Sequence, residues 1–410
     1  MSFLKTLRLQ QFKNHTNTDF SFAEKLNCLV GDNGMGKTNV LDAIFFTCLT
    51  KSYSGLSDAA LIQHNTDFFR IDAHFDNNNN ENFDNKNETN FDNNKGFHNK
   101  NERDFDNKND DFDNNNAHFN TEKNTKITIK QPQKKKKTIE HNGTPYERMT
   151  EHIGRYTVVM LSPDDPYTLM EGSEERRRFI DTTIAQINPT YLQKLSQYNK
   201  VLDQRNALLK QALLQKTSPD VTLLEVYDAQ LNAPANFVFE ARKAWLVEFL
   251  PIFQTYYDAI SNERETVGCR YESGLHTQPF ADILAQNYSR DCLLGRTTGG
   301  VHKDDIQLLI NDLQLKKYAS QGQLKSFTLA LKLAQAEYIR STTQQAPILL
   351  LDDIFDKLDH NRVVHLLKLL HQTNFGQLFI TDTDKNRILR LTAEFGDGFR
   401  VFEIENGTIL

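Results

Sequence analysis

The chain has 410 residues, 38% of them hydrophobic, which is enough for one large core and a smaller inserted part. No apolar run approaches the roughly twenty residues of a membrane span and no signal-peptide pattern opens the chain, so we expect a soluble, cytoplasmic protein without a membrane partner. The formal net charge is −6. The four cysteines, Cys28, Cys48, Cys269 and Cys292, lack metal-ligand spacing, and we interpret them as reduced packing residues.

A strand, a glycine-rich loop and a helix are predicted near the N-terminus. Leu26–Val30 is a mostly apolar run typical of a buried strand, and Lys37–Leu49 places apolar residues at helical spacing. The loop between them, with the first two helical positions, fits the P-loop pattern of glycine, four residues, glycine, lysine and serine or threonine. Its residues are Gly31, Asp32, Asn33, Gly34, Met35, Gly36, Lys37 and Thr38.

A P-loop between a strand and a helix is typical of a site for a nucleoside triphosphate. Its glycines adopt dihedrals closed to other residues, so successive N–H groups turn toward one anion at the positive end of the helix dipole. We predict that these residues bind ATP, that Lys37 contacts the outer phosphates and acts in catalysis, and that Thr38 holds Mg²⁺. The alternative is a glycine-rich turn with an incidental lysine, which the flanking strand and helix disfavour.

An asparagine-rich segment occupies residues 76–124. It holds 12 acidic and 6 basic residues and 19 asparagines, so it accounts for the entire net charge and the rest of the chain is neutral. Because it has few aliphatic residues to bury, it is predicted to be a disordered insertion between two strands. The charge of the whole chain therefore does not argue against nucleic-acid binding.

Basic residues follow in two regions. Residues 126–130 and 138–140 are predicted as strands of a hairpin whose tip is the lysine run 134–137. A mainly helical lid, residues 176–276, opens with arginines at 176–178. We place four further basic residues on its exposed faces: Arg205, Lys210, Arg242 and Lys243. Such charges are often only solvated, but in a dimer their combined field would favour a phosphate backbone.

Residues 320–323 begin a helix with one apolar face and form what we call the signature segment: Ser320, Gln321, Gly322 and Gln323. Ser320 is the expected N-cap, and the helix N-terminus is a second anion site. One nucleotide cannot easily occupy two anion sites unless they face each other across it. Taken alone, the tetrapeptide indicates only a capped helix start.

Two aspartates end the next predicted strand. Residues 348–351 form an aliphatic run, and Asp352 directly after it is the expected second Mg²⁺ ligand. Asp353 stands where a carboxylate can orient or deprotonate the attacking water, and we predict a catalytic role. The alternative for Asp353 is the N-cap of a following helix.

The remaining elements complete an α/β fold. Further predicted elements are hairpins at 306–315 and 399–410, a helix near 363–370 and a strand at 378–380. We predict an ATPase head with a P-loop core sheet and antiparallel β additions, into which the helical lid is inserted. The expected domains are residues 1–175 and 277–410 for the head and 176–276 for the lid.

The order of P-loop, signature segment and Asp352 resembles the ATP-binding-cassette superfamily, in which the signature of one subunit closes on the ATP of the other. The resemblance narrows to the RecF family, related to the heads of SMC proteins, and covers the chain apart from the insertion. It rests on similar segments in the same order: 1–14, 31–38, 161–164, 172–181, 198–210, 299–305, 320–325 and 349–359. By this resemblance Asp359 is the D-loop carboxylate of the ATP site.

Three positions depart from the wider superfamily. Asp353 replaces the usual glutamate, Thr381-Asp382-Thr383 stands where a switch histidine is usual, and no Q-loop glutamine follows residues 158–161. Slow hydrolysis is therefore expected.

The family resemblance implies a role in replication and recombinational repair. An ATP-driven homodimer would clamp gapped DNA or a junction of single- and double-stranded DNA, help RecR and RecO load RecA, and act in the SOS response. Slow, DNA-stimulated ATP hydrolysis would release it. The alternatives are an SMC-type chromosome-organising head, a transporter ATPase subunit and a P-loop enzyme acting on a small molecule. The first needs a long coiled coil and the second a membrane partner.

Overall fold

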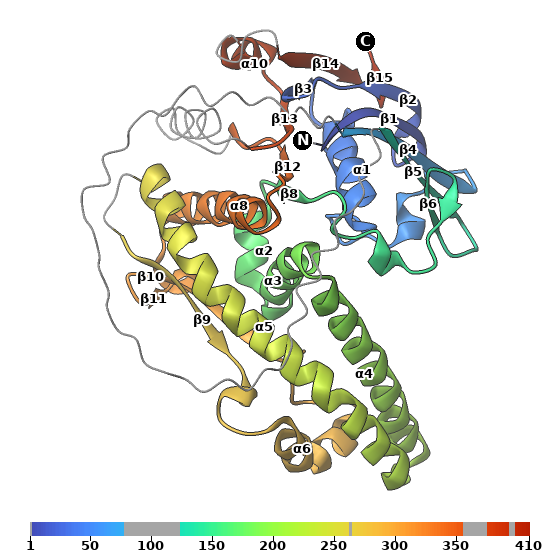
Figure 1. Ribbon diagram of the computed structural model, residues 1–410, viewed down its shortest axis with the longest axis vertical. Helices are drawn as coiled ribbons and strands as arrows, with labels where there is room; N and C mark the ends of the chain where they lie inside the picture. The colour runs from blue at the N-terminus through green and yellow to red at the C-terminus, as the bar shows by residue number, and fades with distance from the viewer. Residues whose placement is uncertain (1, 78–123, 262–264, 356–374, 393–397) are drawn as a thin grey trace.

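The computed structural model describes residues 2–77, 124–261, 265–355, 375–392 and 398–410. Asp359, the helix predicted near 363–370 and most of the insertion lie outside the described residues. Figure 1 shows a strand-rich head, with long helices extending from it. Within the described ranges, no helix combines the length and the apolar character that crossing a membrane requires.

The core sheet has the strand order β15-β14-β3-β13-β12-β8, and all but β15 run parallel. Its strands are β3 Leu26–Val30, β8 Val158–Leu161, β12 Ile348–Leu351, β13 Leu378–Asp382, β14 Phe399–Glu405 and β15 Thr408–Ile409. The strands predicted at 26–30, 348–351 and 378–380 are confirmed, as is the hairpin at 399–410.

Both faces of the core sheet are covered, which explains its continuous apolar strands. In β12, Leu349 and Leu351 belong to one hydrophobic core, which includes residues of the lid helices. Ile348 and Leu350 belong to a second core, which includes residues of α1 (Lys37–Leu49). The second core also includes the antiparallel sheet, of order β2-β1-β4-β5-β6-β7. Its strands are β1 Ser2–Phe12, β2 His15–Ser21, β4 Phe68–Asn77, β5 Asn124–Pro132, β6 Thr138–His141 and β7 Thr144–Pro145.

The asparagine-rich segment enters and leaves the head between two paired strands, as predicted. β4 and β5 are antiparallel from Phe68 opposite Pro132 to Asp76 opposite Asn124. The two ends of the segment are therefore neighbours in the ladder, and the head is continuous across it.

The helices follow in two groups. The lid and its surroundings contain α2 Asp165–Glu171, α3 Ser173–Ile187, α4 Pro189–Gln215, α5 Val221–Ser261 and α6 Phe280–Leu294. Besides α1, the head contains α7 Leu315–Tyr318, α8 Gln321–Thr343 and α10 Lys385–Thr392. Short 3₁₀ turns lie at 58–61 and 149–151 in the head and at 274–276 in the lid. A third sheet, of order β11-β10-β9, joins β9 Val267–Glu272 to the predicted hairpin of β10 Asp305–Ile310 and β11 Leu313–Gln314. One hydrophobic core connects lid and head, and the predicted domain boundaries stay predictions.

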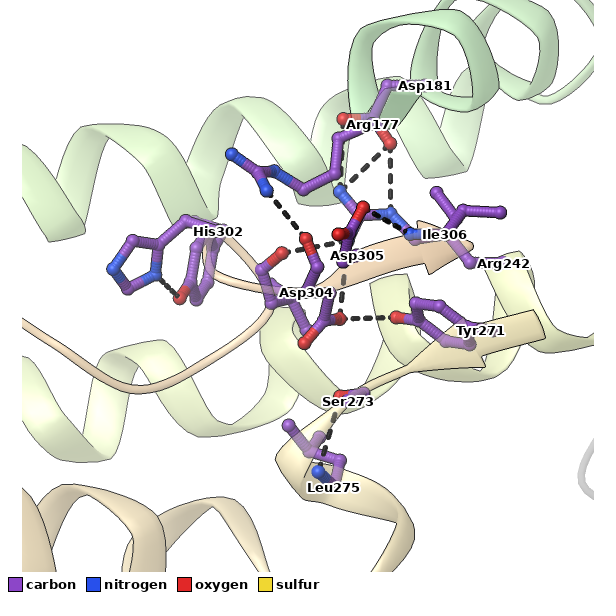
Figure 2. A network of polar contacts seen from close by, with 12 residues as sticks. Arg177, Asp181, Arg242, Tyr271, Ser273, Leu275, His302, Asp304, Asp305 and Ile306 are labelled. Carbon is purple, nitrogen blue, oxygen red and sulfur yellow. Dashed lines mark hydrogen bonds and ion pairs between the residues drawn. The ribbon is translucent and has the colours of Figure 1, made fainter. Parts of the chain in front are cut away.

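Two of the four lid residues predicted on exposed faces are buried, and that prediction was wrong for them. Arg205 is 0% exposed and donates to Asp291 at 2.8 Å, and Arg242 is 2% exposed and donates to Asp181 at 2.9 Å. Figure 2 shows Arg242 together with Asp181 and Asp304. Helical spacing identifies a polar position, but these two side chains are buried against carboxylates that include Asp291, 86 residues from Arg205, and Asp181, 61 residues from Arg242. Lys210 and Lys243 are exposed as predicted.

Candidate nucleotide site and signature helix

The P-loop has the glycine-dependent conformation that its sequence predicts. Gly31, Gly34 and Gly36 have φ values of 149°, 83° and 109°, which only glycine adopts without strain. A Cβ atom on Gly31 would lie 2.3 Å from the carbonyl oxygen of Ile404 in β14, so close packing also excludes a side chain there. The loop thus presents its backbone at the N-terminus of α1, as an anion site requires.

Lys37 and Thr38 lie where the P-loop prediction places them. The Lys37 side chain is 4% exposed, and its Nζ donates to the carbonyl oxygens of Gly31 at 2.6 Å and Asp32 at 3.0 Å. The Lys37 side chain therefore lies against the loop that is predicted to bind the phosphates. Thr38 Oγ1 donates to Asp352 Oδ1 at 3.0 Å, which joins the start of α1 to the end of β12.

Asp352 and Thr38 fit a Mg²⁺ site. Burial raises the pKa of Asp352 to about 6, while hydrogen bonds from Thr381 and Thr38 act in the opposite direction. A carboxylate and a hydroxyl are hard oxygen ligands, and Mg²⁺ bound to a nucleotide commonly uses only one or two protein ligands. The described residues hold no cluster of three or more histidine, cysteine, aspartate or glutamate side chains suited to a metal.

Asp353 lies directly beside this pair in a constrained conformation. Its φ is 42°, and its backbone N–H donates to Thr381 Oγ1 at 2.8 Å. The same hydroxyl donates to Asp352 Oδ1 at 2.7 Å, so Thr381 connects both aspartates. Thr381 is the first residue of the segment 381–383, which stands where a switch histidine is expected from the family resemblance. The helix that Asp353 would cap lies outside the described residues, and both interpretations of Asp353 stay open.

Two hairpins contact the P-loop, and these contacts were not predicted from the sequence. Asn14 Nδ2 donates to the carbonyl oxygen of Met35 at 3.1 Å, and the Gly407 N–H donates to the same oxygen at 2.9 Å. The buried ring of His15 contacts the carbonyl oxygens of Gly36 at 3.1 Å and Gly407 at 2.8 Å. The Asn-Gly turn at 406–407 was the available signal, but its contact with the P-loop depends on the whole sheet.

A cavity of about 690 Å³ extends from Thr38, Asp352 and Asp353 toward α8. A buried polar cluster lines it: Lys332 Nζ donates to the Tyr53 hydroxyl at 2.9 Å, and that hydroxyl donates to Asp165. Burial lowers the pKa of Lys332. The place of Lys332 in this cavity was also not predicted, although a single charged residue within the apolar run 329–334 indicated an unusual position.

The signature segment begins α8 as predicted. Ser320 is the N-cap, its Oγ accepts from the Gln323 N–H at 3.2 Å, and Gln323 Oε1 accepts from the Ser320 N–H at 2.7 Å. These two bonds form a capping box. Ser320 and Gln321 are exposed, and no residue of the signature segment lines the cavity next to Thr38 and Asp352.

The arginine run 176–178 is tied to its surroundings. Arg176 makes two hydrogen bonds of 2.8 and 2.9 Å to Asp305, Arg177 donates to the Asp304 carbonyl oxygen at 2.5 Å, and Arg178 donates to the Tyr53 carbonyl oxygen at 2.6 Å. In the lysine run, residue 137 pairs with Asp58 at 2.8 Å, whereas residues 134–136 are exposed. Lysines 134–136 therefore lack the contacts to neighbouring segments that each of the three arginines makes.

Comparison with known proteins gives one consistent family. Residues 3–408 match the family model described as the RecF/RecN/SMC N terminal domain. The chain is 36% identical over 406 residues to the DNA replication and repair protein RecF of Bacteroides thetaiotaomicron, covering 99% of this chain and 98% of the relative. A solved structure described as the recombination mediator protein RecF with ATP in the RecFOR pathway is 25% identical, with a TM-score of 0.81, and the match covers 100% of this chain and 97% of that one. The Smc head of Pyrococcus furiosus, 16% identical over 100% of this chain and 95% of its own, has a TM-score of 0.52 and shares the fold alone.

Proposed function

This chain belongs to the RecF family, and from that premise we propose that it binds ATP and Mg²⁺ and acts on DNA as an ATP-dependent homodimer. Its DNA would be gapped duplex or a junction of single- and double-stranded DNA. Slow hydrolysis, stimulated by DNA, would dissolve the dimer. The solved relative described with ATP supports the nucleotide, and the name shared by the relatives supports replication and repair.

One observation supports the dimer: the chain has two candidate anion sites, and the signature segment does not line the cavity beside the P-loop. The P-loop adjoins a cavity that already contains Thr38 and Asp352, whereas the signature segment is exposed and does not line that cavity. A second copy, related by a two-fold axis, would bring its signature segment to the P-loop nucleotide of the first, and the reverse contact would follow by symmetry.

Within this composite site each residue has a separate role. Lys37 would contact the outer phosphates, while the P-loop N–H groups cradle them. Thr38 and Asp352 would hold Mg²⁺, which supplies neutralisation of phosphate charge when it is bound. Asp353 would orient the attacking water, and Asp359 would complete the site by resemblance to the family D-loop.

A cavity of about 900 Å³ between head and lid is our candidate for the DNA contact. Lys51 from the loop after α1 and Lys303 from the segment before β10 line it and are exposed, together with the half-buried Arg177. Burial and the neighbouring charges of Arg296 and Arg177 lower the pKa of Lys303, while Glu174, which also lines the cavity, acts in the opposite direction. No carboxylate in the described part of the chain forms an ion pair with either lysine.

Partners and pathway rest on the family. The solved relative is described as a recombination mediator in the RecFOR pathway. We extend this to RecR and RecO as partners, to assistance in loading RecA and to the SOS response.

The dimer is tested with Ser320→Arg. A large side chain at the N-terminus of α8 would block access to the phosphate of the opposing subunit, so sedimentation with Mg-ATP should show monomers. Titration of the Ser320→Arg variant with ATP at low protein concentration should give the same ATP affinity as the parent protein. Ser341→Arg, an exposed serine near the far end of the same helix, is the matched control and should dimerise normally. A Ser320→Arg variant that dimerises with ATP would show that the composite site is wrong.

The DNA contact is tested by salt dependence. Counterion release predicts a slope of about 0.9 in log affinity against log salt for each phosphate contacted. Changing Lys51 and Lys303 together to alanine should reduce that slope while ATP affinity stays unchanged. Alanine at Lys210 and Lys243 makes the same charge change on exposed faces that do not line the cavity. Equal slopes in the two double variants would exclude this cavity as the DNA contact.

A further inference from the structure

The signature segment is held by a residue outside it. Gln323 uses both ends of its side-chain amide: Oε1 accepts from the Ser320 N–H at 2.7 Å, and Nε2 donates to Glu265 Oε1 at 2.5 Å. The other oxygen of Glu265 accepts from the Tyr257 hydroxyl on α5. The carboxylate therefore links the end of the longest lid helix to the first turn of α8.

This contact fixes the orientation of an amide that could otherwise turn over. A carboxylate only accepts hydrogen bonds, so it selects the NH₂ end of Gln323 and leaves the oxygen end for the Ser320 N–H. In the reversed orientation, two donors would face each other at Ser320. The capping box thus depends on the carboxylate of Glu265 as well as on Ser320 and Gln323.

The backbone around Glu265 is held by neighbouring segments. Gln254 on α5 donates to the Glu265 carbonyl oxygen at 3.0 Å and accepts from the Val267 N–H at 2.8 Å. The Asn311 N–H in the β10–β11 turn donates to the carbonyl oxygen of the next residue, Thr266, at 2.7 Å, and the Thr266 N–H donates to Asn311 Oδ1 at 2.8 Å. The half-buried Glu265 is therefore positioned from the lid on one side and from the third sheet on the other.

We propose that Glu265 is a positioning residue for the signature segment and makes its geometry depend on the lid. By holding Gln323, it keeps the Ser320 hydroxyl and the free N–H groups of the first turn directed outward, toward the triphosphate of a second copy. This inference rests on the proposed ATP-dependent dimer and adds the residue through which the lid controls it. Movement of α5 on binding DNA would reach the partner nucleotide by this route.

The test compares Glu265→Ala with Glu265→Gln. Alanine removes a charge-assisted acceptor, so the dissociation constant of the ATP-dependent dimer should rise roughly tenfold. Glutamine retains an oxygen for Gln323 and an NH₂ group that the Tyr257 hydroxyl can accept from, so it should restore dimerisation to within about threefold. ATP affinity at low protein concentration should be parental in both.

The matched control is Glu248→Ala. Glu248 on α5 accepts from the Tyr338 hydroxyl on α8 at 2.8 Å, so this change also removes a carboxylate bond between the same two helices, but away from the signature segment. It should leave dimerisation unchanged. Thermal unfolding of each variant separates a local effect from loss of the fold.

The possible outcomes separate the two proposals. A parent protein that remains monomeric with ATP would overturn the dimer, and the role of Glu265 with it. If the parent dimerises and Glu265→Ala does so equally well, only the role of Glu265 is wrong. Equal weakening by alanine and glutamine would show that charge matters and amide orientation does not, which also overturns the positioning role. The same conclusion would follow if Glu248→Ala weakened the dimer as much as Glu265→Ala.

Discussion

The P-loop and the signature segment are both helix N-termini suited to an anion, yet the molecule treats them differently. The P-loop is supported by the β1–β2 turn through Asn14 and by the last hairpin through Gly407. Its lysine is 4% exposed. Ser320, in contrast, is exposed, and a single side chain from another element, that of Glu265, holds its capping partner.

The difference indicates which half of the site is complete within one chain. Lys37, Thr38 and Asp352 already contact one another or their own loop, so in the proposed function this half would bind nucleotide in a monomer. The signature half presents donors to solvent, where a second molecule can supply the ligand. Changes in the first half should therefore alter binding or chemistry, and changes in the second should alter assembly.

Asp353→Asn should have the largest effect. Loss of a residue that orients or deprotonates the water should slow ATP hydrolysis by about 100-fold or more, while ATP still binds through Lys37 and Asp352. Single-turnover hydrolysis measures the rate, and sedimentation should show ATP-bound dimers that persist. Asp384→Asn is the control, because that aspartate only caps the start of α10. If the Asp353→Asn variant hydrolysed ATP at the parental rate, Asp353 would act only as a helix cap.

Lys37→Ala should weaken ATP binding by roughly ten- to a hundredfold, because charge-assisted hydrogen bonds contribute about 1.5 to 3 kcal/mol. Calorimetric titration with Mg-ATP at low protein concentration checks this. Lys325→Ala, which removes a lysine from the signature helix, should leave monomer affinity unchanged. Parental affinity in the Lys37 variant would contradict the P-loop assignment.

Gly407→Ala tests whether the C-terminal hairpin supports the P-loop. A Cβ there would lie 2.3 Å from the Asn14 carbonyl oxygen, at a residue whose φ is 76°. Gly143 has a similar φ of 86° and open space around it, so Gly143→Ala carries the backbone strain without the clash. The free energy of unfolding in urea should fall by about 1 to 3 kcal/mol more for Gly407→Ala, and ATP affinity should fall with it. An equal loss of unfolding free energy in the two variants would argue against support of the P-loop by this hairpin.

His152→Gln tests the support at the opposite end of α1, and its effect should be the smallest. His152 Nε2 contacts the Thr47 carbonyl oxygen at 2.6 Å, and burial lowers its pKa from 6.5 to about 4. Between these values the unfolded chain binds a proton that the folded chain does not, so stability falls as the pH drops below 6.5. The loss should be on the order of 1 kcal/mol at a pH of about 5.5 and should be absent from the glutamine variant. Urea unfolding at neutral and acidic pH measures how the free energy of unfolding changes with pH in the parent and in the variant. The same change in both proteins would exclude His152 as its origin.

Local sequence patterns were sufficient to identify much of the site. Strand β3, helix α1 and strand β12 begin and end at the predicted residues, because apolar periodicity and glycine positions act over a few residues. Ser320 was identified as an N-cap for the same reason. The roles of Glu265 and Lys332 were not identified, since Gln323 lies 58 residues from Glu265, and the partners of Lys332 lie 167 or more residues away.

The sequence by itself determined the P-loop, the capped start of α8 and the aspartates at the end of β12, because each depends on the backbone conformation of its own short segment. Only the tertiary structure decided which cations are available to a ligand. Arg176 is paired with a carboxylate 129 residues away and Arg205 with one 86 residues away, whereas Lys51 and Lys303 remain exposed in the cavity between head and lid. Pairing and burial depend on which distant segments fold against a side chain, and a charge alone does not carry that information.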